Sequence, residues 1–382
     1  MKKRVKILLT GGGSGGHVYP LLAVAEKMGK IAIENGLVLD VRYFGARDFY
    51  SQVLEEGGIK ISTVISSKIR RYFSLKNLLE PFRILLGLFQ ALWKIYWYMP
   101  DAAFSKGGPG ALPVLLACKF YMIPIIIHES DSIPGLTNVI SGKLAKRVFL
   151  GFKSAEEYFS KKDVSVVGNP VKAIITNQEV SEEYEKEAKS YFGLNPSEPV
   201  LLVMGGSQGA TRINDFILEN LSDLLVKFQI LHQVGAANYE SYKNEYSFLS
   251  KDWSDIQKSR YQFHGFFDKD LDKAYAAADM VLARAGAGTI FELAYMGRPS
   301  ILVPLPEAAN NHQFENARQY SEIGAAIVIE QENFKENIVV EQIIKLLGNK
   351  EILKKMGEAA KTFYIPNTAE IIAQKVLELA AS

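Results

Sequence analysis

The sequence predicts an α/β protein made of two doubly wound domains, each a parallel sheet covered by helices. The chain has 382 residues, which exceeds one ordinary hydrophobic core and favours two domains. Short β-branched runs alternate with longer helical stretches, a pattern typical of parallel sheets with crossover helices. Two of these runs, 5–9 and 200–204, lead directly into glycine clusters, so each half opens in the same way.

In the first half we expect strands at 5–9, 41–44, 61–65, 102–104, 125–128, 148–150 and 164–167. A break at Gly168-Asn169-Pro170 and a polar helix over 182–191 follow. In the second half we expect strands at 200–204, 229–234, 261–264, 280–283, 300–303 and 326–329. Because ligands of such sheets bind beyond the carboxyl ends of the strands, we expect both glycine loops to face a cleft between the halves.

The composition restricts the classes of function. Apolar residues make up 48% of the chain and charged residues 23%, which is typical of a globular protein. The 44 Lys and Arg residues nearly balance the 42 Asp and Glu residues, so we expect no nucleic-acid partner. The single cysteine, Cys118, excludes a disulfide framework and a Cys-based zinc site. The apolar run 7–9 is too short for an export signal, and we expect a cytoplasmic protein.

The segment from residue 60 to residue 98 is basic and aromatic. It carries seven Lys and Arg residues and one acid, Glu80, and aromatic residues are interleaved with them. Over 82–98 the pattern is helical, and it places Arg83, Gly87, Gln90 and Lys94 on one face. Two cations interrupt this stretch, which disfavours a transmembrane helix.

Two interpretations of this segment stay open, and both can hold at once. The helix can be a crossover packed on its own sheet, or the segment can lie on an anionic membrane surface. The residues expected to contact such a membrane are Arg70, Arg71, Phe73, Phe82 and Trp93.

The first glycine loop predicts an anion site. Gly11, Gly13 and Gly16 satisfy G-x-G-x-x-G, and a helix that begins after the loop offers free N–H groups to a phosphate. A dinucleotide site also needs an acid at the end of the second strand. That strand ends in Phe44-Gly45-Ala46, so a nicotinamide enzyme is disfavoured. A purely structural tight turn is the other alternative.

His17 directly follows this loop and is a candidate catalytic base. At a helix N-terminus the helix dipole disfavours the imidazolium form, which leaves a neutral ring that can accept a proton near pH 7. The alternative is a histidine that only caps the helix.

Two further strand-to-helix loops lie in the second half. In Gly205–Ala210 the hydroxyl of Ser207 and the amide of Gln208 can contact a phosphate or a sugar. In the loop 284–292, small residues expose backbone N–H groups at a helix start, and Glu292 can bridge two ribose hydroxyls. The alternative for Glu292 is a first-turn acid favoured by the dipole.

Two other polar motifs have plain alternatives. The run 310–313 follows the strand 300–303 and can bind sugar hydroxyls, or it can be a surface loop. Asp268-Lys269-Asp270 looks like the D-x-D metal motif of some sugar transferases. It precedes a helical run over 271–278, so an N-cap with first-turn acids explains it without a metal.

Taken together in this order, GGGSGGHVYP, HES followed by GLTN, GNPV, GGSQGA, and RAGAGTIFE followed by HQFENA resemble the MurG family. The resemblance covers nearly the whole chain. It implies the GT-B fold, with a first domain over 1–168, a donor-binding domain over 169–363 and a last helix, about 364–382, that packs back on the first domain. It also implies catalysis with no metal and no other cofactor.

The resemblance assigns roles residue by residue. His17 and Glu129 are implied to be catalytic, with His17 as base or orienting group for the acceptor 4-hydroxyl. The implied substrate contacts are Ser14, Gly15, Gly16, Asp131, Asn138, Lys172, Ser207, Gln208, Phe267, Ala287, Gly288, Thr289, Glu292 and Gln313. Among these, Phe267 falls where the family contacts uracil through its backbone, Glu292 where it binds ribose and Gln313 where it reads N-acetylglucosamine hydroxyls.

Three positions depart from the family pattern. His128-Glu129-Ser130-Asp131 stands where HEQN is common, so an acid, Asp131, replaces an amide. Lys172 stands where Arg is common, which keeps the charge and loses the bidentate fork. Phe267 replaces an aliphatic residue.

The implied activity is inverting transfer of N-acetylglucosamine from UDP-N-acetylglucosamine to undecaprenyl-diphosphoryl N-acetylmuramoyl-pentapeptide, a step of peptidoglycan synthesis. The implied location is the cytoplasmic face of the inner membrane, peripherally bound to its anionic surface, with cell-wall synthesis proteins as partners. Two other functions stay open: a UDP-sugar 2-epimerase of the same architecture and a non-catalytic nucleotide-sugar binding subunit.

Overall fold

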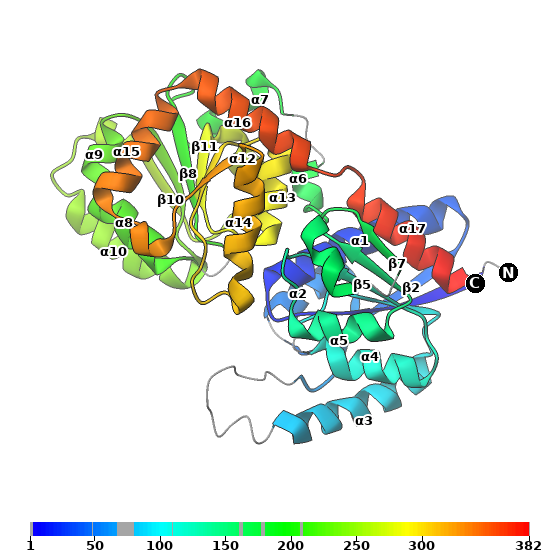
Figure 1. Ribbon diagram of the computed structural model, residues 1–382. Helices are drawn as coiled ribbons and strands as arrows, with labels where there is room; N and C mark the ends of the chain where they lie inside the picture. Colours follow the sequence, from blue (N-terminus) through cyan, green and yellow to red (C-terminus); the bar gives the residue numbers. More distant parts are fainter. Residues whose placement is uncertain are drawn as a thin grey trace. The chain divides into compact units, whose positions relative to one another are not determined.

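The structure is a computed structural model that describes residues 3–47, 49–66, 80–108, 110–159, 163–176, 180–206 and 209–381. The chain divides into two units: Met1–Val171 with Ile365–Ser382 form unit 1, and Lys172–Tyr364 form unit 2 (Figure 1). Five of the predicted contact residues lie outside the described residues: Arg70, Arg71, Phe73, Ser207 and Gln208.

Unit 1 is built on a seven-stranded parallel sheet with the order β3-β2-β1-β4-β5-β6-β7. The strands are β1 (Arg4–Thr10), β2 (Val38–Gly45), β3 (Lys60–Thr63), β4 (Ala102–Ser105), β5 (Ile125–Glu129), β6 (Arg147–Leu150) and β7 (Asp163–Val166). The chain runs outward from β1 to β3 and then crosses back to β4. This reversal makes a switch point between β1 and β4, and ligands of such sheets bind outside the strand ends at that point.

Helices cover both faces of this sheet, so its strands are apolar on both sides. In β1, Leu8 packs with α3 and α4, whereas Ile7 and Leu9 on the opposite face pack with α1 and α17. The helices of unit 1 are α1 (Gly15–Glu34), α2 (Phe49–Glu56), α3 (Glu80–Tyr98), α4 (Ala111–Phe120), α5 (Leu136–Leu144), the 3₁₀ segment η2 (Lys153–Phe159) and α17 (Thr368–Ala381).

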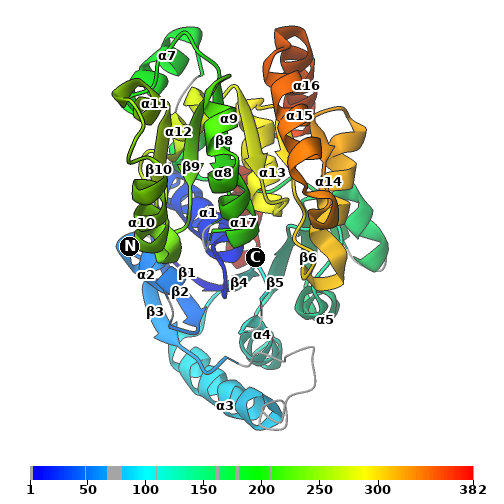
Figure 2. The same ribbon diagram turned by 90° about the vertical axis from the view of Figure 1, so that its left-hand side faces the viewer.

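The last helix, α17, belongs to unit 1 although it follows unit 2 in sequence. It packs against α1 (Figures 1 and 2) and also contacts β4. Ile372, Ala373 and Val376 are fully buried in the same core as β1. At its start, the hydroxyl of Thr368 donates to the carbonyl oxygen of Val167, which fixes the returning chain to the end of β7.

Unit 2 repeats this plan with a six-stranded parallel sheet in the order β10-β9-β8-β11-β12-β13. The strands are β8 (Val200–Met204), β9 (Gln229–Gln233), β10 (Tyr261–His264), β11 (Met280–Ala283), β12 (Ser300–Leu302) and β13 (Ala326–Val328). The switch point of this sheet lies between β8 and β11.

The helices of unit 2 cover this second sheet. They are α6 (Ala173–Thr176), α7 (Glu182–Tyr191), α8 (Thr211–Glu219), α9 (Leu221–Leu225), α10 (Tyr239–Leu249), α11 (Asp255–Ser259), α12 (Leu271–Ala277), α13 (Ala287–Met296), α14 (His312–Glu322), α15 (Glu336–Leu347) and α16 (Lys350–Phe363), with 3₁₀ turns η3 (Ala236–Asn238), η4 (Ala309–Asn311) and η5 (Gln331–Asn333). None of the described helices combines the length and apolar character needed to span a membrane.

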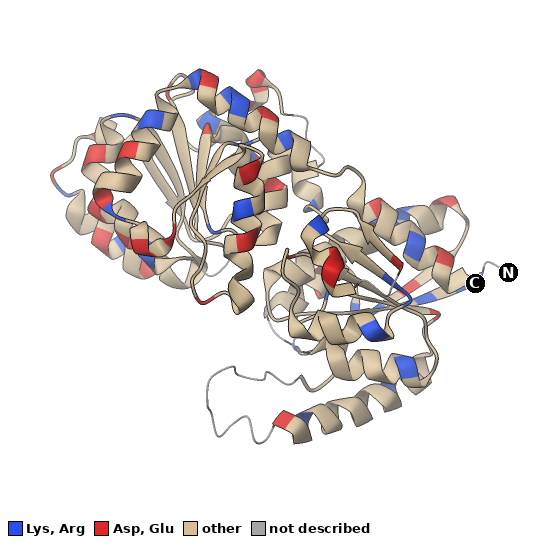
Figure 3. Cartoon of the chain, viewed as in Figure 1, with Lys and Arg blue, Asp and Glu red and all other residues tan. Residues whose placement is uncertain are grey.

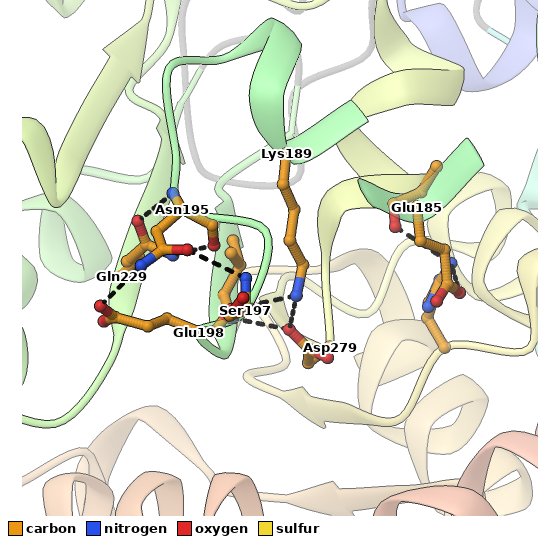
Figure 4. A network of polar contacts seen from close by, with 10 residues as sticks. Glu185, Lys189, Asn195, Ser197, Glu198, Gln229 and Asp279 are labelled. Carbon is orange, nitrogen blue, oxygen red and sulfur yellow. Dashed lines mark hydrogen bonds and ion pairs between the residues drawn. The ribbon is translucent and has the colours of Figure 1, made fainter. Parts of the chain in front are cut away.

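The polar helix α7 is held to unit 2 by charges rather than by a large apolar face. Nζ of Lys189 donates to Oδ2 of Asp279 at 2.8 Å and to the carbonyl oxygen of Glu198 at 3.0 Å (Figure 4). Glu185 pairs with Arg298 at 2.7 Å. Lys189 is buried, so these donors are matched where water is excluded.

The structure confirms the fold class, and each predicted strand is present within three residues of its predicted bounds. The largest differences are at β2, which begins at Val38 rather than 41, and at β3, which ends at Thr63 rather than 65. The end of β3 has a clear cause, because the N–H of Ile65 donates to Oε1 of Gln90 on α3 at 3.0 Å. The side chain of Gln90 therefore accepts the hydrogen bond that a neighbouring strand would otherwise accept from Ile65.

Candidate active site

The first glycine loop joins β1 to α1 at the switch point of unit 1. Gly13 has a φ of +92°, which side-chain-bearing residues rarely adopt. A Cβ at Gly12 would overlap the hydroxyl of Tyr43, and that hydroxyl donates to the carbonyl oxygen of Gly11. Tyr43 therefore holds the loop in place. The loop needs glycine at position 13 for its conformation and at position 12 for space.

His17 lies in the first turn of α1, where the sequence places it. Ser14 is the N-cap of α1 but makes no side-chain cap. Its Oγ instead lies 3.0 Å from Nδ1 of His17. This contact orients the partly buried ring. Gly15 is buried beside it, whereas Gly16 is exposed at the start of the helix.

A second glycine loop, Lys106-Gly107-Gly108 after β4, packs against the first. Gly108 has a φ of +96°, and a Cβ there would overlap the carbonyl oxygen of Gly12. A Cβ at Gly107 would overlap Oδ1 of Asn138. We did not predict this loop as part of the site. Its signal was the same as for the other loops, a short apolar strand that runs directly into glycines.

Glu129 is the last residue of β5 and is buried. One carboxylate oxygen accepts from the N–H of Asp131 at 2.9 Å. The other accepts from the N–H of Gly135 at 3.2 Å and from Nδ2 of Asn138 at 2.9 Å. Burial, together with the nearby Asp131, raises the pKa of Glu129 to about 7. The structure thus brings Glu129, Asp131 and Asn138 together, with Glu129 holding the loop before α5.

A buried polar network lies beside this carboxylate. Nζ of Lys106 contacts Nδ1 of His128 at 2.5 Å and donates to Oδ1 of Asn169 at 3.1 Å and to Oγ of Ser130. Nε2 of His128 contacts the carbonyl oxygen of Gly168 at 2.8 Å. Sequence reasoning did not single out Lys106, because its partners are 22 to 63 positions away in the chain.

In unit 2, the loop after β8 is tied to the segment between β10 and α12 by a side chain that we did not predict. Nε2 of the buried Gln233 donates to the carbonyl oxygen of Gly206 at 3.0 Å. Its Oε1 accepts from the N–H of Phe267 at 2.9 Å. The N–H of Phe267 is therefore already used, and any backbone contact from this residue to a base falls to its carbonyl oxygen. The Phe267 ring is fully buried against Phe192 and His264.

The start of α13, after β11, has the geometry that the predicted anion site requires. Its N-cap is Gly286, which has no side chain to bond the first N–H groups. Ala287, Gly288 and Thr289 form the first turn, so their N–H groups point out of the helix end. A helix start of this kind favours a bound phosphate without a cation.

Glu292, one turn into α13, is buried and oriented by two partners. The hydroxyl of the fully buried Tyr275 donates to Oε2 at 2.8 Å. Nζ of Lys172 lies 3.7 Å from Oε1. Two of the predicted contact residues, Lys172 and Glu292, are thus brought together, and Tyr275 is a member of the group that sequence reasoning missed.

Gln313 lies in the first turn of α14, after the kinked turn η4. Asn310 and Asn311 both have positive φ, 54° and 55°. Oε1 of Gln313 accepts from the N–H of Leu305 at 3.0 Å. This bond orients the side-chain amide of Gln313.

The Asp268–Asp270 motif does not act as the side-chain cap that we expected. Asp270 occupies the N-cap position of α12, but its side chain makes no capping bond. Asp272 in the first turn instead accepts from the hydroxyl of Tyr184. Within the described residues, no group of three His, Cys, Asp or Glu side chains is placed to hold a metal ion.

The helix α3 has one face packed inward and one face exposed. On the inner face, Ala91 and Ile95 are fully buried, and Nζ of Lys94 donates to the carbonyl oxygen of Thr63. The helix has few charged residues (Figure 3), and its outer face carries large, exposed apolar side chains. We call these side chains the α3 aromatic face: Phe82, Leu85, Leu86, Phe89, Trp93, Tyr96 and Trp97. Both interpretations of this segment are therefore compatible with the fold.

Comparison with known proteins places the two units in one family. Residues 7–150 match the glycosyltransferase family 28 N-terminal domain, and residues 200–372 match the glycosyltransferase family 28 C-terminal domain. The sequence is 32% identical over 375 residues to a UDP-N-acetylglucosamine–N-acetylmuramyl-(pentapeptide) pyrophosphoryl-undecaprenol N-acetylglucosamine transferase of Clostridium tetani. That match covers 97% of this chain and 98% of the relative.

Two solved structures share the architecture. A crystal structure of Acinetobacter baumannii MurG aligns with a TM-score of 0.73 at 27% identity, over 98% of this chain and 99% of that one. The UDP-GlcNAc 2-epimerase of Neisseria meningitidis aligns with a TM-score of 0.66 at 15% identity, over 98% of this chain and 100% of that one. The second similarity concerns the fold alone.

Proposed function

The chain belongs to the family of MurG-type N-acetylglucosamine transferases, and from that membership we propose that it transfers N-acetylglucosamine from UDP-N-acetylglucosamine to an undecaprenyl-diphosphoryl N-acetylmuramoyl-pentapeptide. The observation that carries this proposal is the full-length match to such a transferase at 32% identity. The geometry supports it, because each unit presents glycine loops and a helix start at the carboxyl ends of its parallel strands.

The donor is assigned to unit 2. The uncapped start of α13 takes the diphosphate through the N–H groups of Ala287, Gly288 and Thr289. Glu292 accepts hydrogen bonds from the two ribose hydroxyls, because its carboxylate is already oriented by Tyr275. The carbonyl oxygen of Phe267 accepts from the uracil base, since its N–H is used by Gln233. Gln313 reads the sugar hydroxyls. In the sequence of the glycine loop 205–210, Ser207 and Gln208 supply a hydroxyl and an amide for the donor diphosphate and sugar.

The acceptor is assigned to unit 1, with His17 as the base. In the tautomer in which Nδ1–H donates to Oγ of Ser14, Nε2 carries the lone pair. It takes the proton of the acceptor 4-hydroxyl as that oxygen forms a bond to C1 of the donor sugar. The bond from C1 to the diphosphate oxygen breaks, and UDP leaves with the electron pair. In-line displacement of an α-linked group inverts the configuration at C1 and gives a β-1,4 bond.

The charge that develops on the departing UDP is stabilised by fixed dipoles. The N-terminus of α13 supplies positive potential where the diphosphate oxygens lie, so this proposal needs neither a metal nor another cofactor. In unit 1, Ser14, Gly15 and Gly16 offer a similar helix start to a substrate diphosphate. Glu129 holds Asn138 and the 131–135 loop in place beside these groups.

The α3 aromatic face gives the enzyme its place at the membrane. The acceptor carries a polyprenyl tail, so its sugar and diphosphate are reached only at the bilayer surface. Phe82 and Trp93 are each 65% exposed, and side chains of this kind bury in the interfacial region of a bilayer. We place the enzyme peripherally on the cytoplasmic face of the inner membrane, where other proteins of cell-wall synthesis are its partners.

The direct test is transfer of radiolabelled N-acetylglucosamine from its UDP donor to a lipid-linked muramoyl-pentapeptide analogue in the presence of EDTA. We expect labelled lipid product, which would establish the substrate pair and metal independence together. UDP binding without product would contradict the proposal and favour a binding subunit. Conversion of the donor sugar without acceptor would favour an epimerase.

A further inference from the structure

Lys106 is a fully buried cation beside the predicted acceptor site, and the proposed reaction gives it no role. It follows β4 directly and is 1% exposed. Its backbone N–H donates to the carbonyl oxygen of Thr10 at 3.1 Å, next to the first glycine loop. A cation this deeply buried is costly unless it is paired or fully hydrogen-bonded.

The contacts of Lys106 account for every proton of an ammonium group. Its partners are Nδ1 of His128, Oγ of Ser130 and Oδ1 of Asn169. The carbonyl oxygen of Gly168 can only accept, so Nε2 of His128 carries that ring's proton and Nδ1 accepts. Burial and the neighbouring Lys106 hold the pKa of His128 well below its usual range, which keeps the ring neutral. Three acceptors around Nζ require three protons, and only the charged form of lysine has them.

Two carboxylates interact with this charge. Lys106 interacts electrostatically with Glu129 and Asp131. Burial, opposed by both carboxylates, lowers the pKa of Lys106 to about 7. The titratable groups around Glu129 are Lys106 after β4, His128 on its own strand and Asp131 in the next loop; Asn138 on α5 is a neutral donor. Lys106 is thus the positive group that offsets two negative ones.

Lys106 lies beside Ser130-Asp131, one of the positions where this sequence departs from the family pattern. Ser130-Asp131 is the pair that stands where an amide pair is common, and Asp131 adds a negative charge next to Glu129. Lys106 contacts the first residue of this pair directly and balances the charge of the second. It also reaches Asn169, the residue that follows Gly168 at the end of unit 1.

We propose that Lys106 is a positioning residue of the acceptor site: its ammonium group fixes Ser130 and Asn169 and supplies a positive charge that favours the ionised form of Glu129. Glu129 in turn holds Asn138 and the loop before α5. This inference rests on the proposed function for its catalytic consequence, but not for its electrostatic one.

The first experiment measures transfer by Lys106→Met, which keeps an unbranched side chain and removes the charge. We expect kcat to fall roughly tenfold or more, because a misplaced acceptor loop lowers the fraction of reactive geometry. The KM for UDP-N-acetylglucosamine should not change. Adding Asp131→Asn to Lys106→Met should recover part of kcat, since one unbalanced charge is removed. A purely structural lysine would give no such recovery, and an unchanged kcat in Lys106→Met would overturn the proposal.

Lys189→Met is the matched control. Lys189 is also a buried lysine with hydrogen bonds to a carboxylate and a carbonyl oxygen, but it lies on α7 in unit 2 (Figure 4). We expect it to lose stability and keep the kcat of the parent enzyme. An equal loss of kcat in both variants would mean that the effect of Lys106→Met is one of stability, and would overturn the proposal.

A second measurement tests the electrostatic effect of Lys106 on Glu129 and does not depend on enzyme activity. Carbon-13 NMR of protein labelled at the glutamate carboxyl groups follows the titration of Glu129, assigned by comparison with Glu129→Gln. In Lys106→Met the midpoint of Glu129 should rise by roughly one pH unit or more, because an opposite charge has been removed. A midpoint that stays in place would overturn the proposal. Inactive parent enzyme would contradict only the proposed function, since this titration would still be decisive.

The effect of Lys106 on the Glu129 midpoint can also be measured in the Asp131→Asn background, in which one negative charge has been removed. Asp131→Asn and the double variant Lys106→Met, Asp131→Asn differ only in the lysine, and the double variant removes one charge of each sign. We expect a higher Glu129 midpoint in the double variant than in Asp131→Asn. Equal midpoints would overturn the proposal even if Lys106→Met alone did not fold.

Discussion

At the residue scale, Tyr275 and Glu292 are a buried pair in the proposed ribose site. The Tyr275 hydroxyl donates to the Glu292 carboxylate at 2.8 Å, and a bond to a charged group is stronger than a neutral one. Removing it in Tyr275→Phe leaves the carboxylate less well oriented. We expect the affinity for UDP, measured by titration calorimetry, to fall by a factor of roughly ten, which corresponds to about 1.4 kcal/mol.

Tyr320→Phe is the control for this change. Tyr320 is also fully buried, but its hydroxyl has no hydrogen-bond partner among the described residues. Its removal should leave UDP affinity unchanged and should not lower stability. The assignment of Glu292 to the ribose would be contradicted if Tyr275→Phe and Tyr320→Phe bound UDP equally well.

His232 gives unit 2 a predictable response to acid. It is fully buried, with Nδ1 3.0 Å from the hydroxyl of Tyr261 and Nε2 3.1 Å from Oδ1 of Asn214. Burial lowers its pKa to about 3. In the unfolded chain the ring binds a proton near pH 6.5, so its contribution to stability is complete above that pH. It is lost as the pH falls towards 3, by up to about 1.4 kcal/mol per pH unit.

Denaturation at several pH values measures this contribution. With Trp93 and Trp97 replaced by Phe, the remaining Trp253 reports the unfolding of unit 2 by fluorescence. The free energy of unfolding should fall between pH 6 and pH 4, and the slope should be smaller in His232→Asn. Identical slopes in the two proteins would show that His232 is not the group responsible.

The residue scale also separates what the sequence could predict from what it could not. His17 and Glu292 were predicted because each stands at a fixed offset from a strand and a glycine loop, a local signal. Lys106, Gln233 and Tyr275 were missed because their roles depend on partners 17 to 63 positions away. Only the fold brings such pairs together, so a single sequence carries no local signal for them.

At the element scale, the strands were predictable because they are buried on both faces. A run such as 125–127 is apolar at every position, since helices cover both sides of the sheet. The end of β3 was less predictable, because it is set by Gln90 on α3, 25 positions later in the chain. Glycine loops were predictable as loops, but the packing of Gly108 on Gly12 was not.

The α3 aromatic face carries the prediction for membrane binding. Phe89 is 67% exposed and Trp93 is 65% exposed. Fully burying a large apolar side chain is worth about 1.5–3 kcal/mol. Phe89→Ser with Trp93→Ser should therefore weaken binding to phosphatidylglycerol-containing vesicles roughly tenfold or more, as measured by co-sedimentation.

A matched variant tests whether the loss of any exposed aromatic residue weakens vesicle binding. Phe248 on α10 is more exposed than either, but it lies in unit 2. Phe248→Ser should leave vesicle binding unchanged. If the double variant on α3 sedimented with vesicles as well as the parent does, the α3 aromatic face would not be the membrane contact.

At the scale of the whole molecule, the chain is two versions of one plan. Each unit is a parallel sheet whose central strand runs into a glycine loop and then a helix. The sequence predicted this plan because the first strand of each half has the same pattern, an apolar run followed by glycines, in LLTGGG and LLVMGG. It could not assign substrates to the two units from physical pattern alone, since a glycine loop at a helix start binds any phosphate.

The central claim is a division of labour, with the acceptor base in unit 1 and the donor site in unit 2. The most direct measurement compares His17→Ala with the parent enzyme for two properties: the rate of sugar transfer and the affinity for UDP. We predict that transfer is lost by a factor of roughly one hundred or more, because a general base is removed, while UDP affinity stays the same. Equal losses of both, or transfer at the parental rate, would contradict the account.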